Sequence, residues 1–343
     1  MDLKQGIKSL GCYSVWIRVI AVAALCVGFS SPLNANPLAT PDRDWIEYPD
    51  DEAPSQRETD LGKVLFFDNR LSIDRKRSCA SCHNPDLGFG DGLALSADIQ
   101  GKPLQRHTPH LYNLAWASTF FWDGRADSLE QQALMPIQSE DEMNLSIEDL
   151  VIRLNSVSAY REKFAAVYGN GAISEDMIAR ALAAFMRSLV SDNSAFDRFL
   201  RGESNALGPE AKRGLELFQG KAECSKCHDG ANFTDDSFHN IGLPGNDLGR
   251  AEVVSDNSLR GAFKTPSLRN ITLTAPYMHD GSFASLESVI VFYNEGGGND
   301  SLKSELIKPL NLSNQEISDL LAFLGTLESR VDITRPSIPD VNR

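Results

Sequence analysis

The sequence predicts a mostly α-helical protein of two domains that are related by internal duplication and carry long loops. The first observation behind this fold class is a repeat: FFWDGRADSLE at 120–130 returns as YMHDGSFASLE at 277–287. The match extends upstream, where T-P-x-L-x-N at 108–113 recurs at 265–270. Every pair has the same offset, 265 − 108 = 157 residues. A long repeat of this kind indicates a duplicated structural unit.

The second observation is the helical pattern between and after the repeats. Apolar residues follow helical spacing over 146–168 and 174–190, and no extended run alternates as a strand would. Capping boxes, in which a serine precedes an acidic residue by three positions, begin at Ser146 and Ser313. The Gly- and Asp-rich stretches 84–106 and 229–262 are expected to form the long loops.

The first 35 residues are predicted to be a signal peptide. Lys4, Lys8 and Arg18 precede an apolar run over 19–29, and small residues follow near Ala35. The run is too short to span a bilayer, and Leu25 before Cys26 argues against a lipid anchor. We therefore expect cleavage near Ala35, export to the periplasm and no membrane anchor.

The expected organisation of the mature chain is an N-terminal arm at 36–57, a first domain at 58–200 and a second at 201–335. The whole sequence has a net charge of −14. Removing three basic residues and Asp2 with the signal peptide gives −14 − 2 = −16. Such a surface excludes nucleic acid as a partner and favours basic proteins, although solubility alone explains the charge equally well.

Four cysteines remain after the signal peptide, and each belongs to a C-x-x-C-H motif. The motifs are Cys79-Ala-Ser-Cys82-His83 and Cys224-Ser-Lys-Cys227-His228. In this motif the thiols bind the vinyl groups of a haem and the histidine becomes an axial iron ligand. Two disulfides, a zinc site or a redox C-x-x-C are the competing interpretations. Because both motifs use every mature cysteine, the sequence predicts two covalent haems c, one in each cytochrome-c-like domain.

Aligning the two copies of the repeat also shows which residues are expected on the face of each haem opposite its histidine. Adding 157 to Pro136 gives Tyr293, which lies in the predicted helix after Leu286. A phenolate can ligate iron and a proline cannot, so we expect one closed and one open haem. Met278 and His279 are the alternatives to Tyr293 as the sixth ligand. Trp122, at the position of His279, is interpreted either as a packing residue or as an electron relay between the haems.

Near the open haem we expect Gln132 and Glu142 to face the same ring. Pro136 is expected to break the helix between them so that the chain turns back. Peroxide cleavage needs a base that moves a proton from one oxygen to the other. Glu142 suits this role if burial raises its pKa, whereas an exposed glutamate would simply be solvated.

These residues resemble the bacterial diheme cytochrome c peroxidases over nearly all of the mature chain. The resemblance rests on the two C-x-x-C-H motifs together with FFWDGRADSLEQQA, PIQSEDEMN, SAFDRFLRG and KTPSLRNITLTAPYMHDGS. It implies a two-domain α-helical fold, hydrogen peroxide as oxidant and one calcium ion between the haems. Residue by residue, it implies a catalytic Glu142, a distal Gln132, an inter-haem Trp122 and calcium-binding carbonyls on Thr274 and Pro276. The asparagine that binds calcium in the family aligns with His107.

Further departures point to a subgroup. Ordinary members have a methionine where this chain has Tyr293, and many have a blocking histidine in the loop that is here Ser96–Gly101. Both differences resemble the methylamine-utilisation (MauG-type) subgroup, whose members share two oxidising equivalents between the haems and oxidise a tryptophan of a partner protein. The tryptophan through which that subgroup contacts its partner is absent, because Ala222 and Glu223 precede Cys224.

The sequence therefore predicts a periplasmic diheme peroxidase-type oxidoreductase. Its electron source is either a protein side chain oxidised during maturation or a small cytochrome or cupredoxin. A diheme electron carrier without catalytic activity is the alternative from another class. It requires two closed irons, which Pro136 opposes.

Overall fold

The computed structural model describes residues 37–340, so the predicted signal peptide and most of its cleavage region lie outside the described residues. The described chain is mostly helical, which confirms the predicted fold class. Its one regular sheet joins the two-residue strands β1 (Phe238–His239) and β2 (Phe263–Lys264) in antiparallel register. No helix within residues 37–340 is long and apolar enough to cross a membrane.

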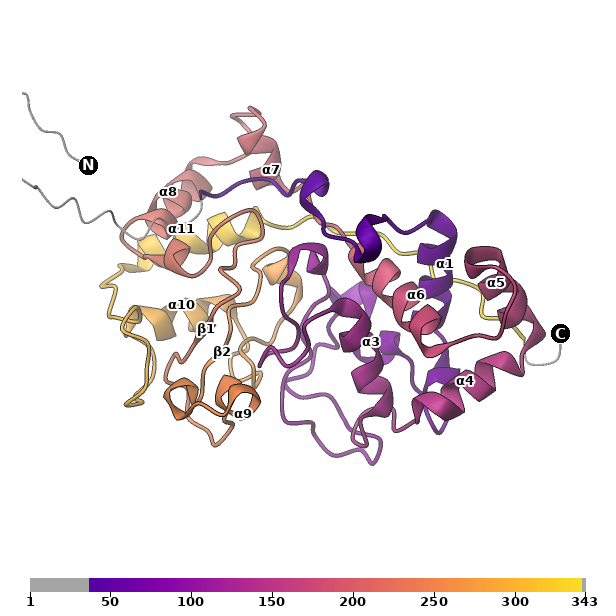
Figure 1. The fold of residues 1–343 in the computed structure, drawn as a ribbon. Helices are drawn as coiled ribbons and strands as arrows, with labels where there is room; N and C mark the ends of the chain where they lie inside the picture. The colour runs from indigo at the N-terminus through magenta and orange to yellow at the C-terminus, as the bar shows by residue number, and fades with distance from the viewer. Residues whose placement is uncertain (1–36, 341–343) are drawn as a thin grey trace, which may run out of the picture. The chain divides into compact units, whose positions relative to one another are not determined.

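The helices fall into an earlier and a later series along the chain (Figure 1). The earlier series is α1 (Gln56–Phe66), α2 (Cys79–Cys82), α3 (Leu129–Gln138), α4 (Ile147–Asn155), α5 (Ser158–Tyr168) and α6 (Glu175–Arg187). The later series is α7 (Ala195–Leu200), α8 (Pro209–Gln219), α9 (Arg250–Val254), α10 (Leu286–Asn294) and α11 (Asn314–Gly325). The predicted helical run 146–168 is two helices, because Val157 between them adopts an extended conformation and is buried in the core.

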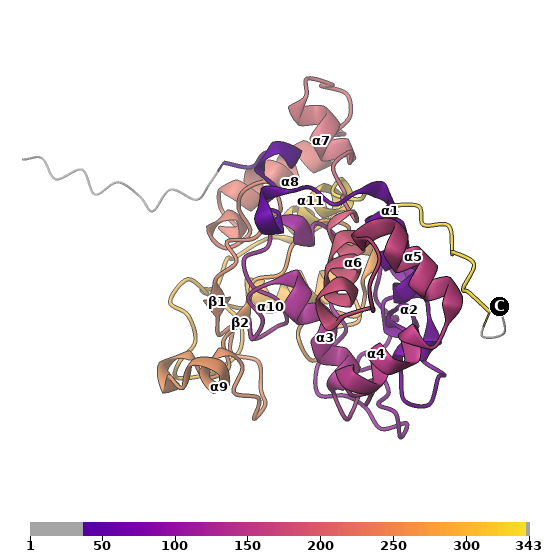
Figure 2. The same cartoon turned by 45° about the vertical axis from the view of Figure 1, so that its right-hand side comes forward.

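Each series has its own hydrophobic cluster, built around one close helix crossing. In the first, α1 packs on α6; in the second, α8 packs on α11, as Figures 1 and 2 show from two directions. A Cβ on Gly62 would lie 1.7 Å from the carbonyl oxygen of Ala181, and one on Gly214 would lie 1.9 Å from that of Asp319. Only glycine permits these backbones to approach so closely. Each glycine is followed four residues later by a phenylalanine, Phe66 in α1 and Phe218 in α8, so the duplication extends to this packing.

The repeated loops also adopt the same backbone conformation in both copies. Asn113 and Asn270 have φ angles of 58° and 59°, and each begins a 3₁₀ turn. Asparagine is among the residues that tolerate this left-handed region. Ser128 and Ser285 then cap α3 and α10 by accepting a hydrogen bond from the third residue of the helix. Since α3 begins at Leu129 and α10 at Leu286, the helices keep the offset of 157 predicted from the sequence.

The two ends of the described chain each pack on the other series of helices. Leu38 in the N-terminal arm contacts the second cluster, and Val331, Ile333 and Ile338 in the C-terminal tail contact the first. The arm is indigo and the tail yellow in Figure 1. In the tail, Arg335 donates hydrogen bonds to the side chains of Asn84 and Asp86, near the first C-x-x-C-H motif.

Candidate functional site: two C-x-x-C-H motifs on one cavity

Both C-x-x-C-H motifs form short helical turns whose histidines are oriented in the same way. The Nδ1–H of His83 donates to the carbonyl of Phe89 at 3.0 Å, and that of His228 donates to the carbonyl of Phe233 at 3.0 Å. A carbonyl only accepts, so Nδ1 carries the proton and Nε2 is left as the ligating atom. Burial lowers the pKa of both imidazoles, which favours the neutral form that binds metals.

The cysteines of both motifs are free thiols on the wall of one cavity of about 880 Å³. Burial is the main cause that raises the pKa of Cys79 and of Cys224 to about 12. Folded interiors are otherwise closely packed, so a cavity of this size, lined mainly by apolar side chains, indicates a large apolar ligand. Paired free thiols, a histidine with an available Nε2 and this cavity fit a c-type haem at each motif.

Tyr293 lines the cavity at the second motif. It lies on α10, and the charges of Cys227 and Cys224 act on its hydroxyl. Burial is the first cause that raises the pKa of Tyr293, followed by these two charges. The phenol therefore stays protonated at neutral pH unless a cation such as ferric iron lies beside its oxygen.

On the first motif's side, α3 and the turn after it present Gln132, Pro136 and Glu142 to the same cavity. The buried Oε1 atom of Gln132 has no hydrogen-bond partner among the described residues. Unpaired buried oxygens are rare, and this one lacks the partner that a bound ligand or water would supply. Burial is the first cause that raises the pKa of Glu142, Arg125 opposes it, and Asp141 adds to it.

The chain turns back later than the sequence predicts. Pro136 does not end α3, which continues to Gln138. Pro136 has no N–H to donate to the Gln132 carbonyl, yet the helix runs on for two more residues. The reversal is made by the next residues: Met143 N–H donates to the Pro136 carbonyl, and Leu145 N–H to the Ile137 carbonyl, at 3.2 and 2.8 Å. These bonds bring Glu142 back to the cavity.

Sequence reasoning missed Arg125 and Thr119, which also line the cavity. The Arg125 guanidinium lies 3.7 Å from the centre of the Phe121 ring and pairs with Asp123 at 2.9 Å. The hydroxyl of Thr119 is buried and has no partner among residues 37–340. The repeat contained a signal for Arg125. The Asp-Gly pair before it is the same in both copies, but the second copy has Ser282 at the matching position, so the arginine is specific to the first site.

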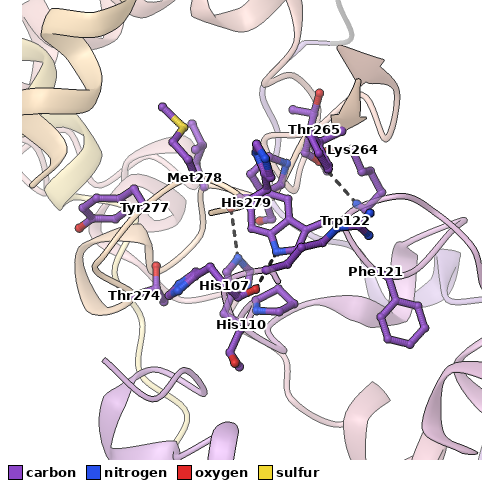
Figure 3. Close-up of a pocket in the computed structure, with 18 of the residues that line it drawn as sticks. His107, His110, Phe121, Trp122, Lys264, Thr265, Thr274, Tyr277, Met278 and His279 are labelled. Atoms are coloured by element: carbon purple, nitrogen blue, oxygen red, sulfur yellow. Dashed lines mark hydrogen bonds between the residues drawn. The ribbon is translucent and has the colours of Figure 1, made fainter. Parts of the chain in front are cut away.

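Trp122 lines the cavity that both motifs share, in edge contact with His279 at 6.5 Å between ring centroids (Figure 3). Its indole Nε1–H donates to the carbonyl of His107 at 2.8 Å. The ring of His279 stacks on Phe263 at 3.6 Å. The sixth-ligand alternative Met278 also lines this cavity, so the structure brings all three predicted ligand candidates to one space.

The residues of the predicted calcium site also line the cavity, but their donor set differs from what calcium requires. Thr274 and Pro276 both line the cavity, and Thr274 lies near His107 in Figure 3. The Nδ1 of His107 lies 3.0 Å from the carbonyl oxygen of Leu93 and 3.2 Å from that of Ala94, so it acts as a donor. Calcium binds oxygen acceptors. The residue at the family's asparagine position therefore does not fit the ion.

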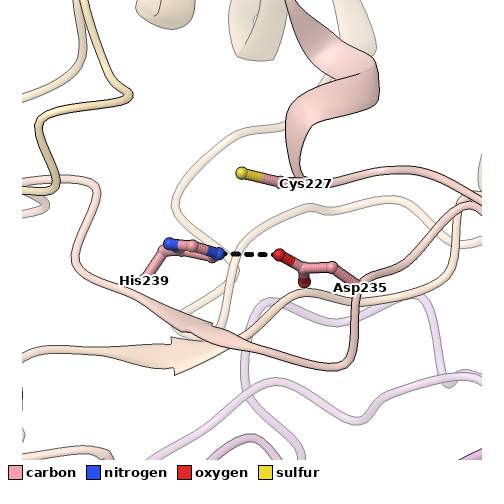
Figure 4. A group of neighbouring side chains, drawn as sticks. All are labelled: Cys227, Asp235 and His239. Carbon is pink, nitrogen blue, oxygen red and sulfur yellow. Dashed lines mark hydrogen bonds and ion pairs between the residues drawn. The ribbon is translucent and has the colours of Figure 1, made fainter. Parts of the chain in front are cut away.

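Cys227, Asp235 and His239 form a cluster with metal-ligand chemistry at the second motif (Figure 4). Asp235 accepts a hydrogen bond from His239 at 2.9 Å, and this bond is the main cause that raises the pKa of His239 to about 10, with Cys227 second. Because Cys227 belongs to the haem motif, we interpret the pair as a charged contact beside the haem attachment point.

The loop that aligns with the family's blocking histidine is held by several hydrogen bonds. Arg77 donates to the carbonyls of Ala97, at 2.7 Å, and of Asp98. Ser96 donates to Asp91 at 2.5 Å and also contacts the hydroxyl of Thr108. No histidine occurs in this loop, so it presents no imidazole to the first motif.

Comparison with known proteins agrees with this site. Residues 56–205 match the family described as di-haem cytochrome c peroxidase. The chain is 49% identical to the methylamine utilization protein MauG of Methylorubrum extorquens, covering 81% of this chain and 80% of that one. It is 36% identical to the cytochrome c551 peroxidase of Nitrosomonas europaea, covering 82% and 84% of the two chains.

Among solved structures, a MauG-like protein associated with microbial copper homeostasis superposes with a TM-score of 0.77 at 34% identity, covering 88% of this chain and 95% of that one. The predicted resemblance is confirmed, including the MauG-like subgroup. With two haem-attachment motifs on one cavity and relatives of this similarity, the chain belongs to the di-haem cytochrome c peroxidase family and is a peroxide-using oxidoreductase of its MauG-like subgroup.

Proposed function

We propose that this enzyme uses hydrogen peroxide at the first C-x-x-C-H site to oxidise a side chain of a partner protein. The observation that carries the proposal is Tyr293, which lines the cavity beside Cys224 and Cys227 where ordinary peroxidases have a methionine. A hard, anionic phenolate stabilises oxidised iron, whereas a thioether stabilises reduced iron. A second site of this kind is suited to holding an oxidising equivalent rather than accepting electrons from a cytochrome.

Two haems c would be held by Cys79, Cys82 and His83 and by Cys224, Cys227 and His228. When bound, they would supply the redox chemistry of peroxide reduction. The same proposal keeps two domains, at 58–200 and 201–335; the two separate hydrophobic clusters support a division of this kind, although Phe196 and Phe199 already belong to the second cluster. The proposed machinery contains no calcium ion, because His107 presents a hydrogen-bond donor at the relevant position.

Glu142 is the proposed acid–base residue. As a carboxylate it takes a proton from one oxygen of hydrogen peroxide and returns it to the other oxygen, which leaves as water. Full reduction to two waters consumes two protons and two electrons, and the partner side chain provides the electrons. Gln132 would orient the peroxide, because its buried Oε1 has no partner among the described residues.

Trp122 is the proposed electron relay. The proposal is supported by its place on the cavity that both motifs line and by its Nε1–H, which donates to the His107 carbonyl. A carbonyl is too weak a base to take that proton, so the indole would pass electrons without losing it.

The partner surface differs from that of the methylamine system, since Glu223 pairs with Lys226 at 2.7 Å where that system has a tryptophan. We place the reaction in the periplasm, following the predicted signal peptide.

The test compares Tyr293→Phe with Tyr277→Phe in the haem-loaded protein. Tyr277 is a matched control, because it is another tyrosine that lines the same cavity. Tyr293→Phe is expected to abolish the low-spin EPR signal of the second site, and Tyr277→Phe is expected to leave it unchanged. The wild type is expected to reach its oxidised state with peroxide alone and to oxidise reduced small cytochromes poorly.

An unchanged low-spin signal in Tyr293→Phe would remove tyrosine as ligand. Met278 would then be the candidate, and with it the second function, peroxide removal driven by a cytochrome or cupredoxin. The cavity position of Met278 is the observation that favours that alternative. Rapid turnover with a reduced cytochrome by the wild type would lead to the same conclusion.

A further inference from the structure

His107 connects three separate segments of the chain with three of its groups. Its backbone N–H donates to the carbonyl of His279 at 2.7 Å, and its carbonyl accepts from Trp122 Nε1 at 2.8 Å (Figure 3). Its ring contacts the carbonyls of Leu93 and Ala94. The residue is 6% exposed. It therefore joins three segments: the loop at Leu93 and Ala94, the first copy of the repeat at Trp122 and the second copy at His279.

The ring bond has a defined direction. Both partners are carbonyl oxygens, which only accept, so the proton lies on Nδ1 and the imidazole donates. The loop is also held tightly against the second copy: a Cβ on Gly281, which has a φ of 65°, would lie 2.3 Å from the carbonyl oxygen of Ala94. That oxygen is enclosed between the ring of His107 and the backbone of Gly281.

A bound calcium ion would also join these segments, but through oxygen ligands instead of hydrogen bonds. Calcium gathers six to eight oxygen atoms at about 2.3–2.6 Å and thereby joins the segments that carry them. An asparagine at position 107 would present an amide oxygen to such an ion, whereas His107 presents an N–H to the surrounding oxygens. The carbonyls of Thr274 and Pro276, the other protein ligands that the family resemblance implies, would supply only two oxygens to such an ion, and the rest would come from water.

We propose that the His107 side chain takes the place of a calcium ion: its Nδ1–H holds the loop at the Leu93 and Ala94 carbonyls, while the backbone N–H of the same residue binds His279 in the second copy of the repeat. The consequence is an enzyme whose fold does not depend on calcium. Because this role of His107 is structural, it does not depend on which partner protein the enzyme oxidises.

The test measures bound calcium and thermal unfolding in the haem-loaded wild type, His107→Asn and His110→Asn. Each protein is incubated with calcium, desalted and analysed for metal, and its Tm is recorded with calcium or with EGTA. The wild type should retain far less than one calcium per chain and show the same Tm in both buffers. His107→Asn restores the amide oxygen, so it should retain about one calcium per chain and gain Tm from it, because a ligand that binds only the folded state stabilises that state.

His110→Asn is the matched control. It makes the same substitution three residues away, where the ring contacts the Ser267 carbonyl at 3.2 Å and accepts from the Tyr112 N–H. It should gain no calcium. A wild-type protein that keeps one calcium per chain, with a lower Tm after EGTA, overturns the proposal even if the variants do not fold. A folded His107→Asn that takes up no calcium overturns it as well.

Discussion

Pro136 and Tyr293 occupy the same position on two helices of identical register. Each is the eighth residue of its helix, because α3 begins at Leu129 and α10 at Leu286, and both residues line the cavity. A side chain that can ligate iron therefore stands at the second motif, and one that cannot stands at the first. We expect this difference to make the two sites functionally unequal.

This relationship predicts different spin states at the two sites. The as-isolated diferric protein should show one high-spin and one low-spin signal by EPR, and it should react with peroxide without prior reduction. A requirement for one reducing equivalent would contradict the prediction and indicate a hidden ligand at the first site. His110 is a poor candidate for that ligand, since both of its ring nitrogens are hydrogen-bonded.

Glu142→Gln should slow the reaction with peroxide by roughly 10²–10⁴-fold, the usual effect of removing a positioned acid–base group. The haem spectra should be unchanged, because Gln retains the size of the side chain. In the wild type the carboxylate is the active form and its pKa is raised by burial, so the rate should fall as the pH drops through a value above that of an ordinary glutamate. Stopped-flow absorbance across a pH series measures both effects.

Arg125→Gln should move that pH profile upwards. The Arg125 charge lowers the pKa of Glu142, so its removal leaves the carboxyl protonated to higher pH. The rate at high pH should change less than the rate near neutrality, which separates an electrostatic effect from a general loss of structure. Arg335→Gln serves as a control, since Arg335 binds the first half at Asn84 and Asp86 instead. A profile that does not move would show that Arg125 has no influence on the base.

Gly62→Ala should destabilise the protein by about 1–3 kcal/mol or more, because the added methyl would collide with the Ala181 backbone in a packed helix crossing. Gly214→Ala should have a similar effect in the second cluster, against Asp319. Gly171→Ala is the control, as no atom lies within 4 Å of a Cβ placed there. Thermal unfolding of the three variants checks the prediction, and a neutral Gly62→Ala would mean that the helices separate readily.

The sequence by itself determined the parts of the site that depend on short spacing or on the internal repeat. The C-x-x-C-H motifs predicted the attachment chemistry, since five adjacent residues carry all the groups that this chemistry needs. The offset of 157 residues predicted the common register of α3 and α10, and with it the contrast between Pro136 and Tyr293. Local backbone preferences and a shared ancestry of the two halves are sufficient for both inferences.

The tertiary structure alone decided the contacts between residues far apart in the chain. The direction of the His107 ring depends on where the Leu93 and Ala94 carbonyls come to lie, and the influence of Arg125 on Glu142 depends on the turn after Gln138. Even that turn was predicted two residues early, because the bonds that reverse the chain come from Met143 and Leu145 rather than from the proline. Hydrogen-bond directions, burial and electrostatic fields arise only when packing brings such segments together, and no local pattern encodes them.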